Sequence, residues 1–552
     1  MSVPTSGVLA AGADGGAGGP SGASSASAAL ADHRARHGVT AGPARRVVIT
    51  GGLVVDGTGH SGRLADVDIV SGQVAQITPA GSLQHADADR VEDAGGLVVC
   101  PGFIDPHSHS DESPFQLLDD TSKILQGITT EIVGNCGTSP DPRPHGGFRG
   151  LYERLDDAGY VTNYCPLVGH GRMRETVMGM NSARPDAEQA QQMGRMLDDA
   201  MEAGAWGLSS GLIYPPGVFS DSDELVALAQ RLPKGCVYAT HMRDEGRNLH
   251  ESIAEALDVA RRAGVRVQIS HLKAAGIPYW GSVGSALAQL DEARSAGVDV
   301  NQDVYPYDAS STTLLACLPP WFQEGGADAV MRRLQDAGCL TRVRRDIEDD
   351  DGSWENVIAG EGYDRIQVAS AASPEHEGAT LAGLASSLGV DPFDVVVQLL
   401  LESRLAATIV DFSMDEADML QVLAHPNTSV CTDGDPDHLV GKPHPRLYGS
   451  FPRVLGRYVR ERQVLGLETA VRKMTSLTAD VFGLTSRGRL YPGYVADVVV
   501  FDPGTIMDRG TYSHPKVPPQ GVRLVMQRGI AVVRDGAWLG VRRGRRLVPG
   551  EG

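Results

Sequence analysis

Two histidines separated by a single residue follow a short apolar run in the segment PGFIDPHSHSD, which begins at Pro101. If this segment is extended, His107 and His109 point the same way, and both imidazole rings can reach one metal ion. A lone pair of this kind is a weak signal by itself. Four further residues with metal-binding side chains each follow a strand-like run: Cys136 in IVGNCG, His241 in YATHMRDEG, His271 in VQISHLK and Asp433 in VCTDGD.

Nitrogen and sulfur donors of these types suit Zn²⁺. Six donors exceed what one tetrahedral zinc can use, which leaves room for a second, weaker site. Each residue also has an ordinary explanation, because cysteine packs as a small apolar side chain, Asp-Gly forms turns, and histidines can bond to backbone in a core. The metal interpretation is favoured because all six follow strands of one predicted barrel. The loop beyond Asp433 lacks the spacing of a calcium loop, and its His438 and His444 are candidate rim residues only.

The elements that must position these side chains are eight strand-like runs that alternate with amphipathic, helix-like segments. The predicted strands begin at Gly102, Ile128, Val161, Ala205, Cys236, Val265, Val298 and Thr428. The alternation predicts an α/β fold with a (β/α)8 TIM-like barrel, whose chemistry belongs at the C-terminal ends of the strands. The long gap before the eighth strand contains its own strand and helix signals, such as DPFDVVVQLLLESR, and predicts an inserted subdomain that covers the barrel mouth.

Short β-rich runs with glycine turns occur near both ends of the chain, as in RVVITGGLVVDG and VRLVMQRGIAVVRDG. They predict a small β-sandwich domain built from both chain ends. The predicted division is a disordered tail over 1–45, the N-terminal segment of the sandwich over 46–101, barrel strands one to seven over 102–310, the inserted subdomain over 311–427, strand eight and the last helices over 428–483, and the C-terminal segment of the sandwich over 484–552.

The composition narrows the classes of function. The chain of 552 residues carries a formal net charge of −20, which disfavours nucleic acid and anionic membranes as partners. Seven cysteines are scattered singly, which is typical of a reduced, cytoplasmic protein. The tail is rich in Ala, Gly and Ser, and it lacks the basic start and apolar core of a signal peptide. No uncharged apolar run is long enough for a membrane span.

Several motifs together resemble the D-aminoacylases, the N-acyl-D-amino-acid deacylases of the amidohydrolase superfamily. The motifs are PGFIDPHSHSD, GITTEIVGNCG, ATHMRDEG, ISHLKAAG, DVYPYDASST, PHPRLYGSFPRVLGRY and PGYVADVVVFDP. The resemblance runs from about Arg46 to Arg534 and implies a barrel with a small β-sandwich. It also implies a small-molecule substrate, zinc held tightly by Cys136, His241 and His271, and a second, weaker site on His107 and His109, with Cys136 as a bridge and Asp433 nearby.

The family also uses a Lys, a Tyr and a Ser around the substrate carboxylate, and the matching residues are Lys273, Tyr305 and Ser311. Many superfamily relatives bridge two metals with a carboxylated lysine on strand four, but AWGLSSGLIY offers none, and the thiolate of Cys136 can take that role. Characterised relatives carry a further Arg after the YPY loop, where this chain reads LLACLPPW. This departure leaves the preferred substrate side chain open. The acyl group and the oligomeric state are also open.

The chemistry implied by the resemblance is hydrolysis of an amide. Zinc on three protein ligands lowers the pKa of its water to about 7 and polarises the carbonyl. Asp433 would take a proton from the water and later give one to the leaving nitrogen, and Lys273 would hold the free α-carboxylate. Two alternatives stay open at this point: a related hydrolase of cyclic amides such as hydantoins or lactams, and an inactive barrel, which would usually have lost some ligands.

Overall fold

The computed structural model describes residues 45–115, 120–436 and 441–550, so the predicted tail lies outside the described residues apart from Arg45. Eight parallel strands form the central sheet in the order β16-β12-β11-β10-β9-β8-β7-β6, which confirms the predicted barrel. The strands are β6 Phe103–Asp105, β7 Ile128–Val133, β8 Asn163–Gly169, β9 Gly207–Gly211, β10 Val237–His241, β11 Arg266–Ile269, β12 Val300–Val304 and β16 Thr428–Val430. Each lies within or next to one of the eight predicted runs.

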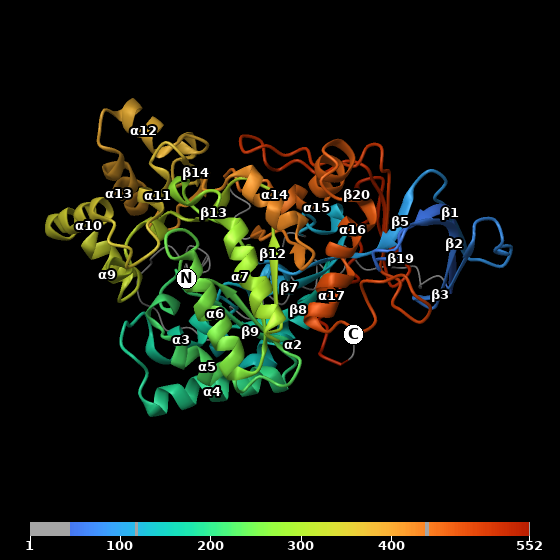
Figure 1. Cartoon of the computed structure of the whole chain (residues 1–552), viewed down its shortest axis with the longest axis horizontal. Coiled ribbons are helices and arrows are strands. Elements are labelled where there is room, and N and C mark those ends of the chain that lie inside the picture. Colours follow the sequence, from blue (N-terminus) through green and yellow to red (C-terminus); the bar gives the residue numbers. More distant parts are fainter. Residues whose placement is uncertain (1–44, 116–119, 437–440, 551–552) are drawn as a thin grey trace, which may run out of the picture.

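Helices follow the strands and cover the outside of the barrel (Figure 1). The main ones are α2 Phe148–Ala158, α3 His170–Met178, α4 Ala187–Glu202, α5 Ser222–Ala229, α6 Leu249–Ala263 and α7 Val283–Ser295. In α4, buried Met193, Leu197 and Ala200 fall on one face at helical spacing, and Asp186 caps the first turn. The strands are buried on both faces because side chains fill the barrel and helices cover it.

The barrel closes between β6 and β16, and we call this junction the seam. Backbone hydrogen bonds across it come just after the two strands: Asp433 N donates to His107 O at 2.9 Å, and His109 N donates to Gly434 O at 3.0 Å. Ser108 and Gly434 also form a parallel bridge. The segments that carry three predicted ligands are therefore the same segments that join the first strand to the last.

The segment between β12 and β16 forms a subdomain with its own apolar core, which includes Phe322, Val396 and Ile409. Its elements are β13 Ser310–Thr313, α8 Pro320–Gln323, α9 Ala327–Arg333, α10 Ala337–Asp349, α11 Val357–Glu361, β14 Ile366–Ser370, α12 Leu381–Leu388, α13 Pro392–Glu402 and β15 Thr408–Asp411. The three strands are antiparallel in the order β13-β15-β14. The next helix, α14 (Glu416–Ala424), packs on α7, β12 and β16, so the chain re-enters the barrel well before residue 427.

Both ends of the chain contribute to one nine-stranded sheet, and the predicted β domain is built from both of them. Its strands are β1 Arg46–Val54, β2 Arg63–Val70, β3 Gln73–Pro79, β4 Arg90–Asp93, β5 Val98–Pro101, β17 Val498–Phe501, β18 Val522–Gln527, β19 Ile530–Arg534 and β20 Ala537–Trp538. Strand β5 pairs with β17, where Pro101 faces Val498, so hydrogen bonds connect the two segments into one sheet. The helices before β17 are α15 Arg446–Arg453, the π-helix η9 Val454–Glu461, α16 Leu467–Lys473 and α17 Ser476–Phe482.

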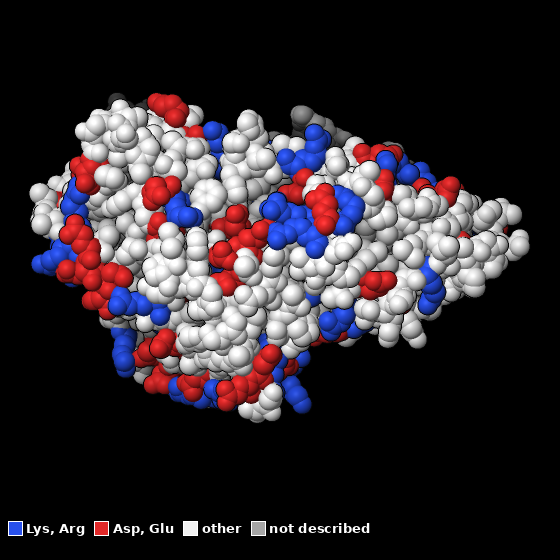
Figure 2. Space-filling model, turned by 45° about the horizontal axis from the view of Figure 1, so that its top comes forward, with Lys and Arg blue, Asp and Glu red and all other residues white. Residues whose placement is uncertain are grey.

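The inserted subdomain and the strands β1–β3 lie at opposite ends of an elongated molecule, with the barrel between them (Figure 1). Acidic and basic side chains are interspersed over the face shown in Figure 2. Among the described residues, no single helix is long and apolar enough to cross a membrane, and the one pair that reaches this length and hydropathy, α12 with α13, is bent by 98°.

Candidate metal centre

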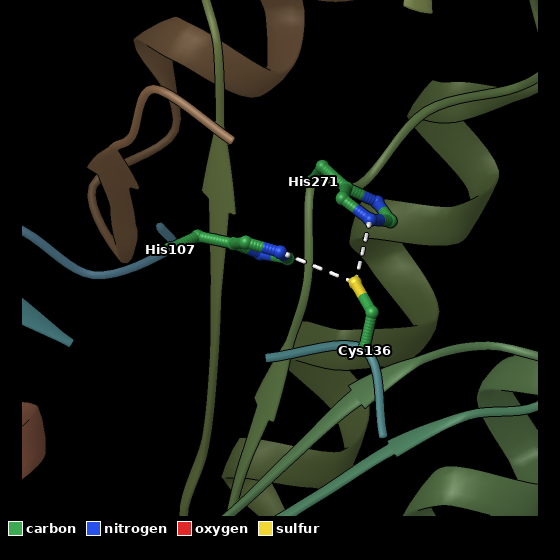
Figure 3. A group of neighbouring side chains, drawn as sticks. All are labelled: His107, Cys136 and His271. Atoms are coloured by element: carbon green, nitrogen blue, oxygen red, sulfur yellow. Dashed lines mark hydrogen bonds between the residues drawn. The ribbon is translucent and has the colours of Figure 1, made fainter. Parts of the chain in front are cut away.

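The six predicted ligands come together at the C-terminal end of the barrel. Cys136, His241 and His271 form the first group, which we call the strand set. The Cys136 Sγ atom lies 3.9 Å from His241 Nδ1 and 3.8 Å from His271 Nε2, and the two nitrogens are 3.0 Å apart. Figure 3 shows the thiol and the His271 ring pointing toward each other. Ligands of a tetrahedral zinc are separated by about 3.3 Å for two nitrogens and about 3.6 Å for nitrogen and sulfur, so this set fits zinc.

His107, His109 and Asp433 form the second group, which we call the seam set because its members flank the seam. Asp433 Oδ1 lies 3.3 Å from His107 Nε2 and 3.1 Å from His109 Nε2. The same His107 nitrogen is 3.2 Å from Cys136 Sγ, an approach that Figure 3 also shows. The thiol therefore adjoins both sets, which suits a sulfur ligand between two metal positions.

The second ring nitrogen of each buried histidine in this centre faces a carboxylate. His107 Nδ1 is 3.6 Å from Asp303 Oδ1, and Glu245 lies 3.7 Å from His241 Nε2 and 3.0 Å from His271 Nδ1. Two of these nitrogens, His107 Nδ1 and His241 Nε2, are buried without a hydrogen bond. Carboxylates in this position set the tautomer and orientation of metal-binding imidazoles. The arrangement thus presents the other nitrogen of each ring to the centre.

Charge is concentrated at this buried centre. Burial raises the pKa of Cys136, but the neighbouring histidines, His107 foremost, outweigh it and hold that pKa well below its usual range. Burial also raises the pKa of Asp433, but Arg446, His107 and His271 hold it well below the usual range of a carboxyl group. The centre therefore holds a thiolate and a carboxylate among imidazoles, a donor set suited to a divalent cation.

Three of the six ligands have a left-handed backbone, which is uncommon for residues other than glycine. The φ angles are 52° at Cys136, 35° at His271 and 47° at Asp433. Each such residue costs on the order of 1–3 kcal/mol and persists only where the surrounding structure fixes it. Crowding is tight beside Cys136, since a Cβ on Gly211 would lie 2.2 Å from the Cys136 carbonyl oxygen. Local strain at these strand ends turns the side chains inward to the centre.

The predicted substrate-binding residues occupy different environments. Lys273 Nζ lies 2.6 Å from Glu245 Oε2 and 2.8 Å from His271 Nδ1. Tyr305 is buried with its hydroxyl group unpaired, and its ring lies 6.3 Å from that of His271. The Ser311 hydroxyl donates a hydrogen bond to the Ile409 carbonyl oxygen of the inserted subdomain at 2.8 Å. Lys273 and Tyr305 thus adjoin the centre, and the Ser311 hydroxyl is engaged by backbone.

Arg446 and Asp303 belong to the centre but were not predicted from the sequence. Arg446 is buried, lies 2.8 Å from Asp433 Oδ2, and stacks with its guanidinium 4.5 Å from the centre of the Tyr305 ring. His444 holds this segment, because it accepts from Arg446 N and donates through Nε2 to Ala309 O, each at 2.9 Å. His444 is therefore a buried residue that fixes the backbone next to Arg446, whereas a position at the rim of the barrel was expected. His438 lies outside the described residues. The motif PHPRLYGS was the only sequence signal near Arg446.

Comparisons with known proteins show which family the chain resembles. A model of the amidohydrolase family matches residues 90–533. The N-acyl-D-glutamate deacylase of Alcaligenes xylosoxydans xylosoxydans is 39% identical over 505 residues, which cover 88% of this chain and 93% of that protein. The D-aminoacylase of the same organism is 36% identical over 520 residues, covering 91% and 97%.

Solved structures give the same relationship. The N-acyl-D-glutamate deacylase from Bordetella bronchiseptica, complexed with zinc and a phosphonate inhibitor that mimics the tetrahedral intermediate, is 34% identical. It superposes with a TM-score of 0.76 over 91% of this chain and 99% of that one. A D-hydantoinase is 17% identical with a TM-score of 0.53, so its likeness extends to the fold alone.

Proposed function

We propose that this chain, which belongs to the D-aminoacylase family of amidohydrolases, hydrolyses the amide bond of N-acyl-D-amino acids to give a carboxylic acid and a free D-amino acid. The resemblance seen in the sequence motifs is confirmed by the relatives described above. The observation that carries the proposal is the convergence of two ligand sets on one buried thiol, with the Asp433 carboxylate and the Lys273 ammonium group beside them.

The donor chemistry supports zinc, with the strand set as the tight site and the seam set, next to Cys136, as a second and weaker one. Zinc held there would supply Lewis acidity toward the scissile carbonyl and toward water. The protein contributes burial and fixed orientation, since His107, Cys136, His241 and His271 are each at most 7% exposed. Such fixed donors lose little freedom when an ion binds.

Asp433 is the proposed general base and acid. Its Oδ1 atom faces His107 and His109, while Oδ2 is paired with Arg446. The pKa held well below its usual range keeps the carboxylate ionised, so it has a free oxygen for a proton from the attacking water, while the same shift makes it a weaker base. The same carboxyl group can return that proton to the leaving nitrogen, which must gain a proton to leave as an amine.

The free α-carboxylate of the substrate needs cationic and hydroxyl donors. Lys273 and Arg446 are the two buried cations beside Tyr305, at 5.8 Å and 4.5 Å from the centre of its ring. The unpaired Tyr305 hydroxyl is a donor that a bound carboxylate would satisfy. Lys273 is paired with Glu245, so we propose that the substrate carboxylate shares this ammonium group or replaces that contact.

The test is a panel of N-acyl-D-amino acids, their L-enantiomers and cyclic hydantoins, with the released amino group followed by ninhydrin. We expect turnover of the linear D-substrates, little of the L-series and none of the hydantoins. A neutral and an acidic side chain with the same acyl group would define the preference that the segment LLACLPPW leaves open. Turnover of hydantoins without turnover of linear D-substrates would contradict the proposal.

A further inference from the structure

Lys123 is a buried lysine that the chemistry above does not use. It is 1% exposed and comes just before the short 3-10 helix η2 (Ile124–Gln126), which leads into β7. A buried ammonium group is costly unless it is paired and hydrogen-bonded. Its Nζ atom lies 3.2 Å from Asp105 Oδ2 and 3.4 Å from Glu131 Oε2, two carboxylates that are themselves buried. The side chain is therefore fixed at the centre of a closed polar network.

The other partners of Lys123 lie on the two segments that meet at the seam. Nζ donates to Ser108 Oγ at 2.7 Å, and Ser108 stands between His107 and His109. It also donates to Thr432 Oγ1 at 2.8 Å and to Gly434 O at 3.4 Å, the residues on either side of Asp433. One ammonium group thus contacts the flanks of all three members of the seam set.

The surrounding groups reinforce the same connection. Asp105 accepts from the backbone of Thr432 at 3.0 Å and of His107 at 3.2 Å, so its carboxylate also joins the two segments. Glu131 accepts from Ser108 Oγ at 2.6 Å and from Ser110 Oγ at 2.8 Å. The main chain contributes two hydrogen bonds across the described part of the seam, from Asp433 N to His107 O and from His109 N to Gly434 O. At the seam, buried side chains therefore hold the two segments together, whereas elsewhere in the barrel the backbone hydrogen bonds between strands do so.

We propose that Lys123 is a positioning residue that holds the His107–His109 segment and Asp433 at one fixed separation across the seam, an inference that rests on the role given to Asp433 in the proposed function. Within the described ranges, Lys123, Asp105 and Glu131 form no hydrogen bond with Cys136, His241 or His271, which are oriented by Glu245, Asp303 and one another. The two sets meet where Cys136 Sγ lies 3.2 Å from His107 Nε2. Loss of the ammonium group should disturb the seam set and leave the strand set in place.

The test compares three full-length variants. Lys123→Met removes the ammonium group but leaves Asp105 and Glu131 as buried anions, so Lys123→Met with Asp105→Asn restores some of the charge balance and guards against misfolding. The matched control is Lys473→Met. Lys473 is also 1% exposed, and its Nζ donates to the carbonyl oxygens of His425 and Thr428 at the opposite end of β16. Both lysines are buried beside one strand, but only Lys123 lies beside ligands.

The measurements are zinc bound per chain at graded free zinc, kcat and KM on an N-acyl-D-amino acid, and melting temperature. In both Lys123 variants we expect the second zinc to weaken and kcat to fall by roughly 10- to 100-fold, with the first zinc and KM within about threefold of wild type. Lys473→Met should lower the melting temperature alone. A wild-type second zinc and kcat in the double variant would overturn the proposal, as would equal losses in the Lys473 control. A wild type inactive on every N-acyl-D-amino acid would instead count against the proposed function, while the zinc titration would still decide the role of Lys123.

Discussion

His241 ends β10 and His271 follows β11, two neighbouring strands that are hydrogen-bonded in register, with Thr240 facing Ile269. The members of the seam set follow the two strands at the barrel junction, where Asp433 is joined to His107 by one backbone hydrogen bond. A continuous ladder fixes ligand spacing through the backbone, whereas the seam depends on buried side chains. The difference supports the proposal that the strand set holds an ion tightly and that the seam set holds a weaker ion and the proton-transferring carboxylate. Four predictions can break or sharpen this comparison.

The largest effect is expected from Cys136→Ala, because the thiol adjoins both sets. We expect zinc and activity to be lost together, since two histidines alone fall short of the three protein ligands that a catalytic zinc requires. Zinc per chain by elemental analysis and kcat are the measurements. Cys165→Ala is the matched control, as that cysteine is also buried, on β8. Full zinc in Cys136→Ala would remove the thiol from the ligand set.

Asp433→Asn should separate the two sets. The amide cannot accept and return a proton, so kcat should fall by at least roughly 10²–10⁴-fold, while the strand set keeps its zinc. The measurement is kcat with and without excess zinc, together with zinc per chain. A simple ligand role for Asp433 predicts the reverse, with lost metal and recovery of rate on added zinc. Near-normal kcat in the zinc-loaded variant would exclude Asp433 as the general base.

Lys273→Met tests the substrate side of the strand set. Loss of one charge-assisted hydrogen bond to the α-carboxylate should lower kcat/KM for N-acyl-D-amino acids by about 100-fold, on the order of 2–3 kcal/mol. The substitution leaves Glu245 buried without its cation, so Glu245→Gln alone and with Lys273→Met serve as controls. Substrate amides, which lack the carboxylate, should be poor for all these proteins. Unchanged kcat/KM on free acids would place the carboxylate on Arg446 instead.

The smallest effect is expected from His109→Gln. This ring is the most exposed of the candidate ligands, at 19% of its side chain, and it belongs to the seam set alone. With the strand set intact, a zinc with three protein ligands is still complete, so kcat should stay within about tenfold of wild type. His241→Gln, which breaks the strand set, is the matched comparison. Equal loss of zinc in the two variants would contradict the division into two sets.

The sequence predicts the barrel well because its evidence is local. Each strand is a short β-rich run bounded by turn residues, and each helix has its own apolar face and cap, as in α4. The residue at which the inserted subdomain ends was harder to predict from the sequence. Helix α14 packs on the barrel whereas α13 packs in the subdomain core, and this difference in packing partners separates the two helices. Packing partners are a property of the fold and leave little trace in a helix's own residues.

The site was predictable for residues with a chemical signature and a strand before them. The six ligand candidates satisfy both conditions, and the structure brings them together. Arg446 and Lys123 do not, because their partners Asp433 and Thr432 are 13 and 309 residues away along the chain, and a Lys or Arg is most often on the surface. The Ser311 hydroxyl donates to the Ile409 carbonyl oxygen, and its role at the substrate stays a prediction.

The position of the seam also determines when the seam set can form during synthesis, because the chain is made from its N-terminus to its C-terminus. His109 and Asp433 are separated by 324 residues along the chain. Strand β5 likewise pairs with β17, which is made much later. Contacts of such long sequence separation form late, because loop closure must precede them. During synthesis every residue of the strand set has been made once the ribosome has passed His271, whereas the seam set is incomplete until it has passed Asp433. A nascent chain therefore carries all three residues of the strand set well before it carries the proposed general base.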